Sequence, residues 1–131
     1  LFDAASALTG VCRKASFEGQ GPMLLEALAA RHGEYESSRT TRLTLTLNDG
    51  MYTVDWSPLI DMLKDETEQV EARAAHFHAA MAHALLQQAQ QIRENTAVTR
   101  VGMTGGVFQN RVLTEKCVEL LTKNGFEVLY Y

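Results

Sequence analysis

The sequence predicts an α/β fold, a sheet with flanking helices, in a single domain that covers residues 1–131. Residues 43–56 alternate apolar and polar side chains around Asp49-Gly50, which predicts a β-hairpin whose leucine-rich face lies against a core. Residues 98–131 read as strand, helix and strand, which predicts a βαβ unit with parallel strands. Between the two lies a long helical pattern, from about residue 67 to 95, whose many alanines allow close approach to a sheet or another helix.

Three shorter helices complete the predicted elements. Residues 1–8 place apolar side chains on one side of a short helix. A second helix has Pro22 in its first turn and runs to about residue 32, where Gly33 ends it. A third begins at Ser57-Pro58, with Ser57 as the N-cap and the proline at the first helical position.

Composition excludes several classes of function. A formal charge of −4 without a basic cluster argues against a nucleic-acid partner. No apolar run approaches the roughly 18 residues that span a bilayer, so no membrane partner is expected. Cys12 and Cys117 are far apart and outside any CxxC, which fits a reducing, cytoplasmic compartment. The chain starts at Leu1 and ends at Tyr131 without a tail, so we expect a piece of a longer protein.

The most informative stretch is Gly105-Gly106, which follows a β-branched strand and precedes a helix. Glycines without Cβ atoms let a phosphate or nucleoside approach bare backbone, and the first helical N–H groups carry partial positive charge. Asn110 adds a side chain that can donate and accept. The stretch is neither a P-loop nor a dinucleotide fingerprint. A tight strand-to-helix turn explains it about as well as a nucleotide site does.

Carboxylates near the early glycines are further candidates. Glu18 and Glu26 lie near Gly19 and Gly21, and an ionised carboxylate can accept hydrogen bonds from ribose hydroxyls. Solvated surface positions are the more frequent outcome for glutamate. For Asp3, in the first turn of the first helix, favourable interaction with the helix dipole is the better interpretation of the pattern alone.

Three histidines on the long helix invite a metal hypothesis, and helical geometry argues against it. His76 and His78 point about 200° apart around the axis, and His76 and His83 are roughly 10 Å apart along it. No pair can close on one ion without outside ligands, so we assign no metal ligand to this chain. Packed histidines near a cleft are the preferred interpretation, in which His76 or His83 could still touch a ligand.

Read together, Gly105-Gly106-Val107-Phe108-Gln109-Asn110, residues 1–8 (LFDAASAL) and residues 17–20 (FEGQ) resemble a known family. This family is that of the nickel–iron hydrogenase maturation carbamoyltransferases (HypF family). The sequence resembles their C-terminal Kae1-like carbamoyltransferase domain. Gly-Gly-Val-x-x-Asn is shared with tRNA threonylcarbamoyl-transfer proteins and antibiotic O-carbamoyltransferases. The Phe-Gln-Asn ending, the Phe-Glu-Gly-Gln loop and Phe77-His78 favour the hydrogenase branch.

The resemblance implies a fold and an activity. The fold would be the second half of an actin/Hsp70/sugar-kinase-like (ASKHA) ATPase module. The full-length enzyme takes carbamoyl phosphate and ATP, forms carbamoyl adenylate, and transfers the carbamoyl group to the C-terminal cysteine of a partner protein. That group becomes a cyanide ligand of the hydrogenase iron. The family's metal ion, iron or zinc, would be held by residues outside this chain.

The resemblance also implies nucleotide-binding residues, with either loop glycine as a candidate and the catalytic residues left open: Asp3, Gly19, Gly21, Glu26, Gly105, Gly106 and Asn110. This fragment alone is expected to be inactive and to bind nucleotide weakly or not at all. Two alternatives belong to other classes. A sugar-kinase-like or actin-like ATP module would need phosphate-loop and catalytic aspartate motifs, which we do not find. A non-catalytic interaction domain would use the long helix and the hairpin as docking surfaces.

Overall fold

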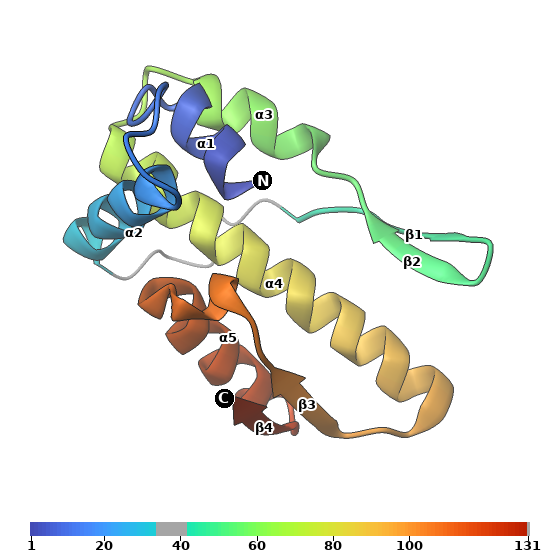
Figure 1. The fold of residues 1–131 in the computed structure, drawn as a ribbon. Helices are drawn as coiled ribbons and strands as arrows, with labels where there is room; N and C mark the ends of the chain where they lie inside the picture. Colours follow the sequence, from blue (N-terminus) through green and yellow to red (C-terminus); the bar gives the residue numbers. More distant parts are fainter. Residues whose placement is uncertain (34–41, 131) are drawn as a thin grey trace.

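The computed structural model describes residues 1–33 and 42–130, which form helices around one long helix, α4 (Val70–Thr96), and two small sheets (Figure 1). The other elements, in chain order, are α1 (Phe2–Leu8), α2 (Gln20–His32), β1 (Leu45–Asn48), β2 (Met51–Val54), α3 (Ser57–Lys64), β3 (Arg100–Met103), the 3₁₀ helix η2 (Gly106–Gln109), α5 (Arg111–Lys123) and β4 (Glu127–Tyr130). The chain is therefore α/β, as predicted. Within the described ranges, no helix has the length and apolar composition needed to cross a membrane.

Helix α4 is the element on which the others pack. Its small side chains include Ala74, Ala80 and Ala82, each 0% exposed. Because alanine projects little beyond the backbone, both α2 and α5 pack against α4. This confirms the prediction of a long helix that admits close neighbours.

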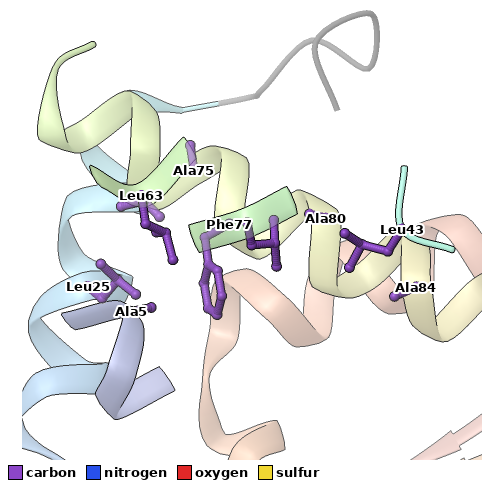
Figure 2. Close-up of a cluster of buried hydrophobic side chains, with 11 residues drawn as sticks. Ala5, Leu25, Leu43, Leu63, Ala75, Phe77, Ala80 and Ala84 are labelled. Carbon is purple, nitrogen blue, oxygen red and sulfur yellow. The ribbon is translucent and has the colours of Figure 1, made fainter. Parts of the chain in front are cut away.

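The core has two clusters that meet along α4. The first surrounds Phe77, which is 0% exposed, with side chains from α1, α2, α3 and the segment before β1 (Figure 2). The second lies under α5 and the β3–β4 sheet and includes Cys117. Phe2 and Met81 pack against both clusters. Burial raises the pKa of the Cys117 thiol to about 12, so the thiol stays protonated in the core.

The strands form two separate two-stranded sheets rather than the single sheet with flanking helices that was predicted. Strands β1 and β2 pair antiparallel, with Leu45 opposite Val54, which confirms the predicted hairpin. Strands β3 and β4 pair parallel, with Val101 opposite Val128, and α5 connects them. The predicted βαβ unit is thus confirmed up to residue 130, while Tyr131 lies outside the described residues.

The hairpin meets the core only at its base. Alternation predicted that its leucine face would be buried, but burial decreases outward, from Leu43 (3% exposed) to Leu47 (56% exposed). Figure 1 shows the reason: the hairpin extends away from the helices. Beyond the base, Tyr52 is held by its hydroxyl, which accepts a 3.0 Å hydrogen bond from Asn95 Nδ2 at the end of α4.

Two predicted helix starts differ from the structure: α3 begins one residue earlier than predicted, and α4 begins at Val70 rather than at about residue 67. Helix α3 includes Ser57, and its N-cap position is Trp56. Here Asp55 Oδ1 accepts from the backbone N–H of Ser57 at 3.0 Å and from its hydroxyl at 2.6 Å, so the aspartate takes over the predicted capping role. Near Gln109 the chain first makes the 3₁₀ turn η2, and α5 then begins after Asn110.

Candidate nucleotide site

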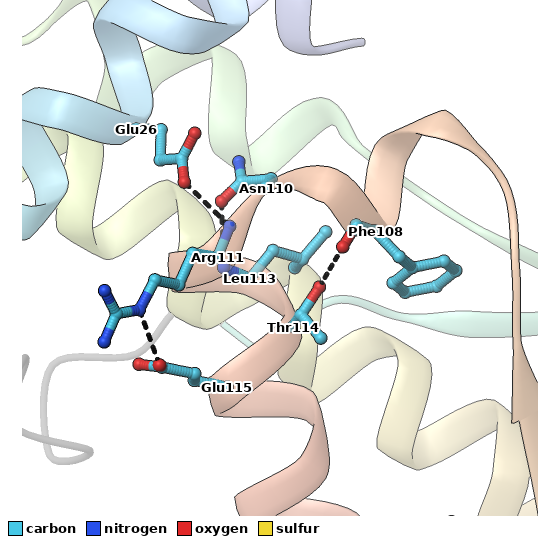
Figure 3. Close-up of polar contacts among 7 residues, drawn as sticks. All are labelled: Glu26, Phe108, Asn110, Arg111, Leu113, Thr114 and Glu115. Atoms are coloured by element: carbon cyan, nitrogen blue, oxygen red, sulfur yellow. Dashed lines mark hydrogen bonds and ion pairs between the residues drawn. The ribbon is translucent and has the colours of Figure 1, made fainter. Parts of the chain in front are cut away.

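The start of α5 brings together two predicted site residues that are far apart in sequence. Asn110 is the N-cap of α5, and its Oδ1 accepts from the backbone N–H of Leu113 at 3.0 Å. Glu26, on α2, accepts from the backbone N–H of Arg111 at 2.7 Å (Figure 3). Both side chains therefore lie at the end of α5 that carries partial positive charge and unpaired N–H groups.

The double-glycine bend just before this helix is open. Gly105 has φ +103°, a backbone conformation that residues with a Cβ rarely adopt. A Cβ added at Gly105 or at Gly106 would meet no atom within 4 Å. Behind the bend, η2 is held to α5 by the hydroxyl of Thr114, which donates to the carbonyl of Phe108 at 2.7 Å (Figure 3). The bend is thus firmly placed yet accessible to a ligand.

A buried histidine, His78, lies directly behind Asn110. His78 is 1% exposed, and its Nδ1 lies 2.7 Å from the carbonyl oxygen of Ala74. Because a carbonyl only accepts, Nδ1 carries the proton and Nε2 accepts from Asn110 Nδ2 at 2.8 Å. Burial is the largest influence on this ring and lowers its pKa, although the Ala74 carbonyl and the Glu26 charge act in the other direction.

The candidates from the first two helices line a separate hollow. Asp3, Gly19 and Gly21 share a hollow of about 260 Å³ between α1 and the loop before α2. The two glycines differ in what they do. A Cβ at Gly21 would lie 2.9 Å from Cβ and Oγ of Ser6, so glycine there lets α2 approach α1 closely, whereas a Cβ at Gly19 would meet nothing within 4 Å. Gly19 is therefore the one that offers backbone to a ligand.

A larger hollow, of about 430 Å³, lies between α2, α4 and α5. Its lining combines small apolar side chains, including Ala29 and Ala79, with a charged rim that includes Glu26 and Arg111. The Arg111 guanidinium pairs with Glu115 at 2.7 Å (Figure 3). Neither hollow is lined by Gly105, Gly106 or Asn110, so the structure places the candidates in two neighbouring groups rather than in one cleft.

An aromatic contact connects the two groups. The ring of Phe2 meets the rings of Phe77 and His78 edge-on, at centroid distances of 5.0 and 5.6 Å. Asp3 follows Phe2 on α1, and His78 is bonded to Asn110. Asp3 and Asn110 are therefore connected through the half-buried ring of Phe2 and the buried ring of His78.

Sequence reasoning did not find the contact between His78 and Asn110. It considered His76, His78 and His83 as metal ligands and preferred packed histidines, which the burial of His78 confirms. In residues 1–33 and 42–130, no three His, Cys, Asp or Glu side chains are grouped so that they could hold a metal ion. The Phe77-His78 pair had contributed to the family resemblance, but the contact partner of the histidine could not be predicted from the sequence.

The family description "Carbamoyltransferase, Kae1-like domain, second subdomain" matches residues 1–131. The carbamoyltransferase HypF of Synechocystis sp. is 31% identical over 131 residues, which are 99% of this chain and 16% of that protein. The probable carbamoyltransferase HypF of Methanocaldococcus jannaschii is 26% identical over 132 residues, covering 100% of this chain and 17% of that protein.

A solved structure is also similar. It is the crystal structure of full-length HypF in the phosphate- and nucleotide-bound form, with a TM-score of 0.87 and 32% identity over 99% of this chain and 17% of that one. The chain thus spans about a sixth of the length of these relatives. These matches show that the chain belongs to the HypF carbamoyltransferase family, in which it corresponds to the second subdomain of the Kae1-like domain.

Proposed function

We propose that this chain is the nucleotide-binding part of a carbamoyltransferase, built as the second half of an actin/Hsp70/sugar-kinase-like ATPase module. In this proposal the whole protein uses carbamoyl phosphate and ATP, forms carbamoyl adenylate, and carbamoylates the C-terminal cysteine of a partner protein in hydrogenase maturation. Any metal ion is held by residues outside this chain.

The proposal rests on one observation: the side chains of Glu26 and Asn110 both lie at the start of α5, beside an open glycine bend. Glu26 Oε1 binds the N–H of Arg111, and Oε2 has no hydrogen-bond partner in the part of the chain that the structure describes. That oxygen can accept from a ribose hydroxyl. The exposed carboxylate of Asp3 offers further acceptors. Family membership adds support, because the solved HypF relative is described as nucleotide-bound.

The contribution of these residues is positional. Formation and use of an acyl adenylate depend strongly on orientation and on charge stabilisation. Acceptors on Asp3 and Glu26 would hold the sugar, while bare backbone at Gly19, Gly105 and Gly106 would let the nucleotide lie close to the chain. None of these groups needs to be a base. We therefore expect the 131-residue chain alone to give no carbamoyl transfer, and an assay that detects turnover from it would contradict this.

Calorimetric titration of ATP into the full-length enzyme tests the site. Asn110→Ala removes one side-chain contact to the nucleotide, so we expect ATP affinity to fall by roughly five- to tenfold. Asn110→Asp keeps an oxygen that can cap α5 but loses the amide donor, so a loss of affinity in both variants is not explained by uncapping. Asn48→Ala, on the exposed hairpin, is the matched control. ATP affinity of Asn110→Ala equal to that of the control would remove Asn110 from the site.

A further inference from the structure

His78 connects the central helix to the start of α5. Its ring is 1% exposed and makes one hydrogen bond at each nitrogen, to the Ala74 carbonyl at 2.7 Å and to Asn110 Nδ2 at 2.8 Å. The edges of Phe2 and Phe77 pack against it. A ring held on several sides has little freedom to rotate, so its Nε2 lone pair has a fixed direction.

That fixed lone pair determines the orientation of the Asn110 amide. In the observed orientation the amide nitrogen donates to His78 Nε2, and the amide oxygen accepts from the N–H of Leu113 at 3.0 Å. A 180° flip would place the amide oxygen against the Nε2 lone pair and the amide nitrogen against the Leu113 N–H. Both contacts would then be repulsive, so only one orientation is stable.

The oriented amide has capacity left for a ligand. Its nitrogen has a second N–H, and its oxygen has a second lone pair. Neither has a partner among the residues that the structure describes. Asn110 is half-buried, and the accessible bend at Gly105 and Gly106 lies directly before it. An outward donor and an outward acceptor at known positions can distinguish one edge of a ligand from another.

We propose that His78 is a positioning residue, which acts through Asn110 by fixing which edge of the amide faces the nucleotide. The proposal rests on the proposed function, because it assumes that Asn110 touches the nucleotide. His78 itself lies behind the asparagine and makes no contact with the ligand. Its loss would leave the Leu113 N–H as the contact that orients the amide, so flipped and unproductive orientations would be populated more often.

Two amide substitutions in the full-length enzyme separate the two nitrogens of the ring. His78→Gln can place an amide oxygen near the position of Nε2 and so keep an acceptor for Asn110. His78→Asn can keep a donor for Ala74 near Nδ1 but has no group that reaches Asn110. We expect His78→Asn to weaken ATP binding and to raise KM for ATP by about fivefold, the loss of one hydrogen bond, with kcat at saturating ATP little changed. His78→Gln should restore most of the affinity.

A merely structural role gives a different result. It would lower the folded fraction and hence kcat in both variants, without the difference in ATP affinity between them. Equal ATP affinities of His78→Gln and His78→Asn would therefore overturn the proposal. Melting temperatures measured on the same samples report folding separately.

A double-mutant cycle with Asn110→Ala completes the test. If His78 acts through Asn110, His78→Asn has no further effect on ATP affinity once Asn110 is alanine. An additive loss would contradict the proposal. If Asn110→Ala itself leaves ATP affinity unchanged, the assignment of Asn110 to the nucleotide site fails first. If it weakens binding while His78→Asn does not, the positioning role alone is wrong.

Discussion

The two groups of candidate residues differ in how the protein already uses them. In the hollow between α1 and α2, Asp3 is exposed and its carboxylate makes no hydrogen bond within the described ranges. At the start of α5, both Glu26 and Asn110 already bind backbone N–H groups of the helix. Asp3 is available to a ligand alone, whereas, in the proposed function, Glu26 and Asn110 combine helix capping with ligand binding. Substitution of Asp3 should therefore change affinity without changing stability, whereas substitution of Glu26 or Asn110 should change both.

The largest effect should come from the ring that supports both groups. Phe77→Ala removes a side chain that is 0% exposed and that contacts Phe2 and His78, and we expect it to cost about 3–5 kcal/mol of folding free energy. Urea titration of the chain, followed by circular dichroism, measures this. Phe17→Ala, at a phenylalanine that is 55% exposed, is the control and should change stability by less than about 0.5 kcal/mol. Similar losses in both variants would contradict the described core.

A smaller loss of stability is expected for a substitution in the first group. Gly21→Ala would force a Cβ to within 2.9 Å of Ser6, and overpacking of this kind costs about 1–3 kcal/mol. Gly102→Ala, on β3, has open space around it and is the matched control. Since α1 carries Asp3, Gly21→Ala should also weaken ATP binding by the full-length enzyme. Unchanged stability would show that α1 and α2 do not pack as described.

A pH titration should give the smallest effect and should concern the second group. Burial, as the largest cause, lowers the pKa of His78, and it also lowers the pKa values of His76 and His83. Above about pH 6.5 these rings are neutral in both folded and unfolded chains, so stability is fully present there. Below it the unfolded chain binds protons that the folded chain does not, so stability falls with pH by up to about 1.4 kcal/mol per unit for each such group.

Two polar groups that face His78 influence its titration, and they determine the pH dependence expected for His78→Gln. These are the Glu26 carboxylate, whose charge raises the pKa of His78, and the neutral Asn110 amide, which donates to Nε2. His78→Gln removes the titrating ring and should flatten the pH dependence between pH 7 and pH 5. An unchanged slope would mean that His78 does not titrate as its burial requires.

Local signals in the sequence were sufficient for most elements. Asp49-Gly50 favours a tight turn and Gly33 favours the end of a helix. The hairpin and the end of α2 could therefore be predicted from these residues alone. The start of α3 was missed because the side chain of Asp55 competes for the cap, a choice that depends on geometry. Exposure of Leu47 was missed because alternation predicts a face and does not say whether anything covers it.

The candidate site was harder to predict than the fold. An asparagine at this position is suited both to capping a helix and to binding a ligand, so the pattern around Gly105-Gly106 could not decide between a turn and a nucleotide site. The family resemblance supplied the residues, and the structure then separated them into two groups. The contact of His78 with Asn110 joins neutral side chains 32 residues apart, a distance at which helical spacing rules say nothing.

The most direct test is a crystal structure of the full-length parent enzyme with bound ADP. The account predicts ribose hydroxyls within hydrogen-bond distance of Asp3 and Glu26, and an Asn110 amide that contacts the nucleotide while still donating to His78. A nucleotide bound elsewhere, with Asn110 bonded only to His78 and Leu113, would contradict the account.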